Sequence, residues 1–213
     1  MRIAFAGNPN SGKTTMYNAL TGRNEKVGNW AGVTVDKIEA PIRKAYSCGL
    51  ELTAVDLPGA YSMSPFTSEE SVTSTYVKNE NPDAIINIVD ATNLSRSLFF
   101  TTQLLELGIP VGVALNKTDI NRKRDTRIDI KLLSKKLGCP VFETVSIDSD
   151  NSDLAQVIQT AAALKGKGQK APYLHPEVDQ TDRAAVVEAD KQRFSFVNDI
   201  VRKVEHRKVL TKN

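Results

Sequence analysis

A phosphate-binding motif stands near the start of the chain. The residues Gly7-Asn-Pro-Asn-Ser-Gly12-Lys13-Thr14 match the pattern G-x-x-x-x-G-K-[ST]. In this pattern the glycines let backbone N–H groups face phosphate oxygens, and the N-terminus of the following helix favours the same negative charge. We expect Lys13 to reach the β- and γ-phosphates of a nucleotide, and the Thr14 hydroxyl to bind Mg²⁺. A purely structural glycine-rich turn is the alternative, and the predicted strand–loop–helix context disfavours it.

A second motif, Asp56-Leu-Pro-Gly59, follows an apolar run. A carboxylate at this place can hold Mg²⁺ through water, and the Gly59 N–H can contact a γ-phosphate. The same four residues also suit an ordinary turn. Their position at the end of a predicted strand, downstream of the phosphate motif, favours the metal-binding interpretation.

A third motif, Asn116-Lys-Thr-Asp119, follows the apolar run VGVAL. The Asp119 carboxylate can accept hydrogen bonds from the N1–H and the exocyclic amine of guanine, whereas adenine offers no such donor pair. We expect Asn116 to tie this loop to the phosphate motif and the Lys117 stem to cover the base. The alternative is a helix cap followed by surface charges.

Short apolar runs alternate with helical patterns along residues 1–165, which predicts an α/β fold with a mostly parallel sheet flanked by helices. The six predicted strands are residues 2–6, 37–47, 50–57, 84–89, 111–115 and 141–145, and the predicted helices are 13–21, 69–79, 93–107, 125–137 and 152–164. The second and third strands should form an antiparallel hairpin around Cys48-Gly49. A polar linker over 165–172 and a helical pattern over 182–208 follow. We therefore divide the chain into a nucleotide-binding domain, 1–165, and a linker with a short helical segment, 166–213.

Composition narrows the class of protein. The chain has 213 residues, of which 40% are hydrophobic and 25% charged, which is typical of a globular domain. It contains no apolar run of about 18 residues that would span a membrane, and no signal peptide. The scattered positions of Cys48, Cys139, His175 and His206 predict neither a disulfide framework nor an iron site. A reducing, cytoplasmic setting is the expectation.

The net charge of +3 is confined to the C-terminal part of the chain. Residues 1–165 carry 18 basic and 18 acidic side chains, whereas residues 166–213 carry 10 and 7. Five basic residues lie close to the end: Arg202, Lys203, Arg207, Lys208 and Lys212. They form either the solvated face of a terminal helix or a segment that approaches something negative.

The three motifs, in this order and at strand ends, resemble the small GTPase fold of P-loop proteins over residues 1–165. The longer strings GNPNSGKTT, VGNWAGVTV, DLPGAYSMSP and VDATNL are similar to the N-terminal G domain of the bacterial ferrous iron transporter family, FeoB. That resemblance implies a GTPase that uses Mg²⁺, is stimulated by K⁺ and regulates Fe²⁺ uptake at the cytoplasmic face of the inner membrane. It also implies a transmembrane iron-permease partner outside this chain, toward which the basic C-terminal residues lead.

The resemblance also assigns roles to single residues. Thr34 would complete the Mg²⁺ shell with Thr14 and Asp56, and Asn10 would bind K⁺ with backbone carbonyls of Gly28 and Trp30. Ser146-Ile147 is a partial match to a fifth motif, in which the Ile147 N–H contacts guanine O6. The implied catalytic residues are Lys13, Asn10, Thr34 and Gly59. The implied nucleotide-binding residues are Gly7, Asn8, Pro9, Asn10, Ser11, Gly12, Lys13, Thr14, Thr15, Gly32, Val33, Thr34, Asp56, Pro58, Gly59, Asn116, Lys117, Asp119, Ser146 and Ile147.

Departures from the related families leave alternatives open. Ala60 stands where Ras-like GTPases carry a water-orienting glutamine, which predicts slow intrinsic hydrolysis. Residues 166–213 are fewer than the helical, GDI-like appendage that FeoB proteins carry, so this segment would be a reduced version. One alternative is a GDP/GTP-sensing module with negligible turnover. Another is a cytosolic GTPase acting on ribosomes or tRNA, although the basic tail lacks the interleaved aromatics of an RNA binder and we expect no nucleic-acid partner. Whether the chain forms a homo-oligomer is left open.

Overall fold

The computed structural model describes residues 1–22, 26–29, 36–63, 68–144 and 152–208. Within these ranges the main sheet has seven strands in the order β2-β3-β4-β1-β5-β6-β8. The strands are β1 (Arg2–Gly7), β2 (Lys26–Asn29), β3 (Asp36–Pro41), β4 (Thr53–Asp56), β5 (Ala84–Asp90), β6 (Val111–Asn116) and β8 (Val141–Thr144). β1, β4, β5, β6 and β8 pair in parallel, while β2 and β3 are antiparallel. The predicted α/β class is confirmed, with one strand more than expected.

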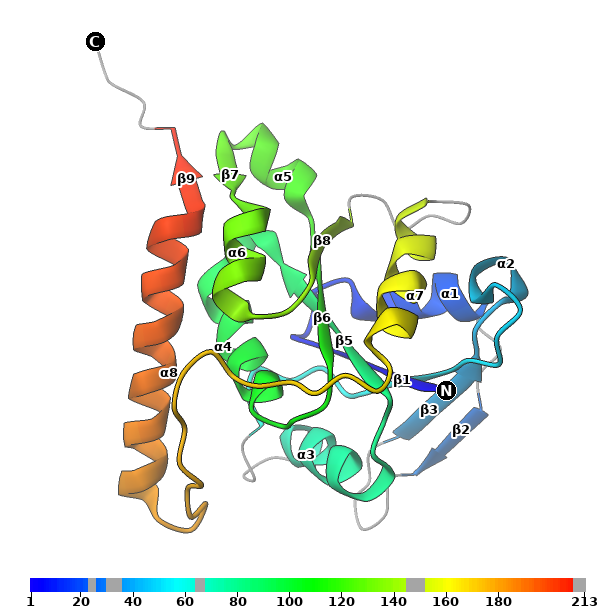
Figure 1. Cartoon of the computed structure of the whole chain (residues 1–213), viewed down its shortest axis with the longest axis horizontal. Coiled ribbons are helices and arrows are strands. Elements are labelled where there is room, and N and C mark those ends of the chain that lie inside the picture. Colours follow the sequence, from blue (N-terminus) through cyan, green and yellow to red (C-terminus); the bar gives the residue numbers. More distant parts are fainter. Residues whose placement is uncertain (23–25, 30–35, 64–67, 145–151, 209–213) are drawn as a thin grey trace.

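Helices cover both faces of this sheet (Figure 1). The helices are α1 (Lys13–Thr21), α2 (Lys44–Ser47), α3 (Ser68–Glu80), the 3₁₀ helix η1 (Ala91–Asn93), α4 (Leu94–Leu105), α5 (Thr118–Lys123), α6 (Ile130–Leu137), α7 (Ser152–Leu164) and α8 (Arg183–Val204). One apolar cluster joins α1 and α7 to one face, and another joins α3, α4 and α6 to the opposite face. β1, β5 and β6 read as nearly continuous apolar runs because they are buried on both faces. Because these strands pair in parallel, their carboxyl ends meet at one edge of the sheet.

Two sequence-based boundaries differ from the structure. The predicted strand over 37–47 ends at Pro41, and Lys44–Ser47 is a helical turn. An Ile42 N–H to Leu52 carbonyl hydrogen bond of 2.9 Å joins the two ends of the connection that contains this turn. The antiparallel pairing with β4 is as predicted. The helix predicted over 125–137 begins only at Ile130, where the Asp129 carboxylate caps it through the Leu132 N–H.

The residues before α6 form a short strand instead. β7 (Thr126–Ile128) pairs antiparallel with β9 (Glu205–Arg207), so the helical pattern predicted over 182–208 ends at Val204. α8 lies along α4 and α6 at the outer side of the molecule (Figure 1). Its buried residues Val197, Ile200 and Val204 belong to the same apolar cluster as α4 and α6. Among the residues described, no helix combines the length and the apolar character needed to cross a membrane.

Candidate functional site

The first motif forms the loop between β1 and α1. Gly12, at φ 100°, turns the chain into α1 in a left-handed conformation that a side chain would disfavour. Asn8, Ser11 and Lys13 are buried, whereas Asn10 is exposed. Pro9, Thr14 and Thr15 are exposed as well. The loop thus has a buried polar side toward the sheet and a solvent-exposed side at the N-terminus of α1.

The second motif lies directly against the first. β4 runs parallel to β1, and Asp56, its last residue, forms an ion pair with Lys13. The two side chains are only 10% and 7% exposed. Gly59 approaches Pro9 so closely that an added Cβ would lie 3.3 Å from three Pro9 atoms. The structure therefore brings together the two motifs, as the sequence predicted, and a side chain at position 59 would crowd Pro9.

Burial sets the acid–base character of Asp56. Removal from water raises the pKa of its carboxyl above the ordinary value, and the Lys13 ammonium opposes this only in part. A second positive charge nearby would further stabilise the ionised form of this carboxylate. Together with the exposed Thr14 hydroxyl at the start of α1, the carboxylate supplies oxygen donors of the type that Mg²⁺ prefers. The residues present fit a magnesium ion.

The third motif follows β6 and is bound to the first loop. The Asn116 side-chain amide donates to the Ser11 carbonyl at 3.0 Å, and the Lys117 ammonium donates to the Asn10 carbonyl at 2.6 Å. Asn116 is 4% exposed, so this link is sheltered from water. The contact between the two loops that the sequence predicted is confirmed. Asp119 lies in the first turn of α5 and is partly exposed, and its carboxylate accepts no hydrogen bond from the residues that the structure describes.

Two carboxylates on neighbouring strands contact this loop, and sequence reasoning missed both. Asp90 ends β5 and lies 3.3 Å from the Lys117 ammonium. Glu143, on β8, accepts from the Thr118 hydroxyl at 3.1 Å and from Arg122 at 2.6 Å. The signal that could have found Asp90 is an acid closing an otherwise apolar strand, AIINIVD, next to the strand that carries the motif.

The segment after Gly59 lies against α4. The Arg96 guanidinium is 3.7 Å from the centroid of the Tyr61 ring, and the Met63 N–H donates to the Gln103 side chain at 2.8 Å. Ala60 is 2% exposed, and its N–H donates to the Gly7 carbonyl at 3.1 Å. The position that sequence comparison with Ras-like proteins assigns to a water-orienting side chain is therefore a buried methyl group.

Part of the predicted site cannot be placed. Gly32, Val33, Thr34, Trp30, Ser146 and Ile147 lie outside the described residues. Gly28 lies in β2, where it is the register partner of Lys37 on β3. Pro58 is partly buried beside Gly59. The roles of these residues stay predictions.

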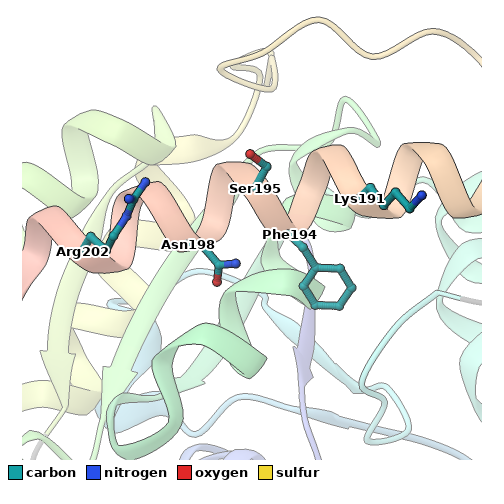
Figure 2. A pocket seen from close by; sticks show the side chains of 5 residues that line it. All are labelled: Lys191, Phe194, Ser195, Asn198 and Arg202. Atoms are coloured by element: carbon teal, nitrogen blue, oxygen red, sulfur yellow. The ribbon is translucent and has the colours of Figure 1, made fainter.

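A separate surface hollow lies away from the motifs. It has a volume of about 580 Å³ and is lined by five α8 residues, Lys191, Phe194, Ser195, Asn198 and Arg202 (Figure 2). The Phe194 ring stacks on Phe99 of α4 with centroids 4.2 Å apart. The hollow carries none of the predicted site residues, and the three motifs gather at the carboxyl ends of the strands instead.

Comparison with known proteins decides the family. A family model described as ferrous iron transport protein B matches residues 1–160. The chain belongs to this family. The FeoB assignment made from the sequence motifs is confirmed.

Curated FeoB relatives are much longer than this chain. The Fe(2+) transporter FeoB of Escherichia coli (strain K12) is 41% identical over 191 residues, which are 88% of this chain and 24% of that protein. The Fe(2+) transporter FeoB of Salmonella typhimurium (strain LT2) is 49% identical over 150 residues, 68% of this chain and 19% of that protein. The chain thus spans about a quarter of the length of the curated relatives it matches.

Solved structures of FeoB domains share the fold. A mutant of S. thermophilus NFeoB bound to GDP superimposes with a TM-score of 0.80 at 30% identity, covering 97% of this chain and all of the other. The cytosolic domain of L. pneumophila FeoB gives a TM-score of 0.81 at 27% identity, with the same coverage. This chain therefore has the P-loop GTPase fold of FeoB G domains, and the predicted C-terminal helix is present.

Proposed function

We propose that this chain binds and hydrolyses GTP and is a Mg²⁺-dependent, K⁺-stimulated switch that regulates Fe²⁺ uptake by a longer transporter. One observation carries the proposal: the phosphate-type loop receives Asn116 and Lys117 from the third motif and Asp56 from the second. Three segments distant in sequence thereby make one site with a phosphate end and a base end. GDP-bound FeoB structures of the same fold support a guanine nucleotide as its ligand.

The base end would select guanine through Asp119. Its carboxylate is the acceptor for the two N–H donors that adenine lacks, and Asn116 holds the loop that carries it against the phosphate loop. At the phosphate end, backbone N–H groups of the loop between β1 and α1 and the Lys13 ammonium would bind the β- and γ-phosphates. Asn8 Oδ1 and Ser11 Oγ are buried without a hydrogen-bond partner among the described residues, so this loop still has polar groups to satisfy.

Thr14 and Asp56 would hold Mg²⁺, with Thr34 as the third protein ligand that the family resemblance implies. When bound, the ion neutralises charge on the phosphate oxygens. The Asp56 carboxylate lies at the end of β4 and pairs with Lys13 of the phosphate loop, which supports this role. Asn10, exposed on the outer side of the loop, would bind K⁺ together with the Gly28 and Trp30 carbonyls.

Intrinsic turnover should be slow. Ala60 is buried and its methyl group cannot hydrogen-bond a water molecule, so the Ras-type route to positioning the attacking water is missing. Lys13 and the N–H of Gly59, a residue that lies close to Pro9 of the phosphate loop, would remain to stabilise the transferred charge.

We further propose that residues 1–165 perform this chemistry and that 166–213, a reduced GDI-like segment, passes the nucleotide state to a transmembrane iron-permease domain. The place of action would be the cytoplasmic face of a bacterial inner membrane. The contacts from Tyr61 and Met63 to α4, and from α4 to α8, give such a signal a packed route. Arg202 and Lys203 pair with Asp199 at an exposed end of α8, and these two cations would approach the membrane in the longer transporter.

The test is GTP hydrolysis by the whole chain in K⁺ and in Na⁺, with ATP as the control for base selectivity. The proposal predicts slow turnover of GTP, faster in K⁺ than in Na⁺, and none of ATP. Asn10→Ala should abolish the K⁺ advantage, whereas the matched change Asn198→Ala, on the exposed face of α8, should preserve it. Tight GDP binding with negligible hydrolysis in saturating K⁺ would instead support a nucleotide-sensing module.

If the K⁺ advantage survives Asn10→Ala, the assignment of Asn10 is wrong. If ATP is hydrolysed as fast as GTP, the guanine site itself is wrong.

A further inference from the structure

Lys117 has an unusual backbone for a lysine. At φ 67° and ψ 25° it adopts the left-handed conformation immediately before α5. Residues with a Cβ seldom take this conformation, and it persists where surrounding contacts hold it in place. The contacts that hold Lys117 therefore also hold the loop that presents Asp119.

The Lys117 ammonium is held from two sides. It donates to the Asn10 carbonyl of the phosphate loop at 2.6 Å and lies 3.3 Å from Asp90 Oδ2. Asp90 comes from the strand next to β6, and its register partner there is Asn116. The lysine side chain therefore bridges the phosphate loop to the end of β5.

Asp90 is itself fixed. Its Oδ1 accepts from the Thr92 N–H at 2.9 Å and from the Thr92 hydroxyl at 2.5 Å, which makes Asp90 the N-cap of η1. Oδ2 is left to face Lys117. The adjacent Ala91 carbonyl accepts from the Asn121 side chain at 2.7 Å, so the end of β5 also contacts α5, the helix that begins within the base-binding loop (residues 116–119).

The carboxylate on the other neighbouring strand contacts different groups. Glu143 accepts from Thr118 and from Arg122, both in α5, and forms no hydrogen bond or ion pair with Lys117. The Asp90 and Lys117 side chains are 18% and 30% exposed, whereas Arg122 is 50% exposed. Because a sheltered ion pair is screened less by water, Asp90 should influence the loop more than Glu143.

We propose that Asp90 is a positioning residue for nucleotide binding. By holding the Lys117 ammonium over the Asn10 carbonyl, it locks the base-binding loop to the phosphate loop and so slows dissociation of the nucleotide. The inference rests on the proposed function, since it concerns the same guanine nucleotide. It adds a residue on β5, outside the three motifs, to the machinery that retains the ligand.

The test is the dissociation rate of fluorescent mant-GDP after mixing with excess GDP. Asp90→Asn removes the charge but keeps an oxygen that can cap η1. We expect the dissociation rate to rise about tenfold, the loss typical of a hydrogen bond to a charged group, with a smaller effect on association. Asp129→Asn makes the same chemical change at the N-cap of α6, away from the nucleotide, and should leave the rate unchanged. Glu143→Gln should change it less than Asp90→Asn.

A double-mutant cycle separates positioning from general structural support. If Asp90 acts through Lys117, Asp90→Asn should raise dissociation less than about twofold in a Lys117→Met background. A full tenfold effect in that background would overturn the proposal. Should Asp90→Asn fail to fold, Thr92→Val, which removes only the hydroxyl donor to Oδ1, should still speed dissociation about two- to threefold.

Different results would overturn the proposed function and the role of Asp90. Wild-type protein that does not bind mant-GDP would overturn the proposed function and with it this inference. Wild-type protein that binds mant-GDP, with Asp90→Asn and Thr92→Val releasing it at the same rate as wild type, would overturn the role of Asp90 alone.

Discussion

Two clusters of charged side chains in this molecule differ in how completely they are satisfied. Between α4 and α8, Glu106 accepts from Arg193 Nε at 2.8 Å, from Arg193 Nη2 at 3.0 Å and from the Tyr173 hydroxyl at 2.8 Å. At the strand ends, by contrast, Asp119 accepts nothing from the described residues, and Ser11 Oγ is buried without a partner among them. In the first cluster the charged side chains are hydrogen-bonded to one another, and these bonds stabilise the packing of α8. In the second cluster polar groups without partners among the described residues are available to bind a ligand.

Removing the predicted guanine contact of the strand-end cluster should have the largest effect on nucleotide affinity. Asp119→Asn replaces an acceptor with an amide that presents a donor to the guanine N–H groups. We expect GDP affinity to fall by about 10²–10³-fold, because buried polar groups are left unpaired. Xanthosine diphosphate, which carries a carbonyl in place of the exocyclic amine, should then bind better than GDP. Competition against mant-GDP measures both.

The thermal midpoint should change little in this variant, since the Asp119 carboxylate forms no hydrogen bond or ion pair with the described residues. Asp179→Asn, the same change in the exposed segment before α8, is the matched control and should leave GDP affinity intact. An Asp119→Asn protein that still prefers GDP to xanthosine diphosphate would contradict the assigned base contact.

Breaking the α4–α8 cluster should affect stability and leave binding intact. Arg193→Ala leaves Glu106, whose side chain is 12% exposed, without its two-pronged partner. We expect a loss of about 3 kcal/mol in the free energy of unfolding, because the carboxylate is then a largely buried charge without its main partner. Urea denaturation of wild type and variant, followed by circular dichroism, measures the difference.

Arg202→Ala is the matched control on the same helix. Its pair with Asp199 is exposed, so the loss should be below about 0.5 kcal/mol. Equal losses in the two arginine variants would show that the Glu106 cluster does not stabilise the packing of α8. A weaker GDP affinity in Arg193→Ala would show that the two clusters are not independent.

The strand-end cluster was largely predictable from sequence, because its residues are fixed by local motifs. Gly7 to Thr14 specify a strand, a loop and a helix within one stretch, and Asn116 to Asp119 follow a run apolar enough to be an inner strand. The proximity of Lys13 and Asp56 was predictable, because parallel strands end at the same edge of a sheet.

What sequence could not predict are the contacts that depend on register between distant segments. Asp90 faces Lys117 only because β5 and β6 pair with Asp90 opposite Asn116. β7 and β9 have three residues each and stabilise each other across a long separation in the chain, so neither has a periodicity of its own to detect. Tyr173 lies in a segment without helix or strand, and nothing near it in sequence indicates that its hydroxyl reaches Glu106.

The central claim is that the strand ends form a site for guanine nucleotides, and equilibrium titration of the wild-type chain with GDP and with ADP in Mg²⁺ and K⁺ tests it most directly. The account predicts saturable one-to-one binding of GDP and at least about a hundredfold weaker binding of ADP, since adenine cannot supply the N–H donors that Asp119 accepts. Equal affinity for the two nucleotides, or no binding of either, would contradict it.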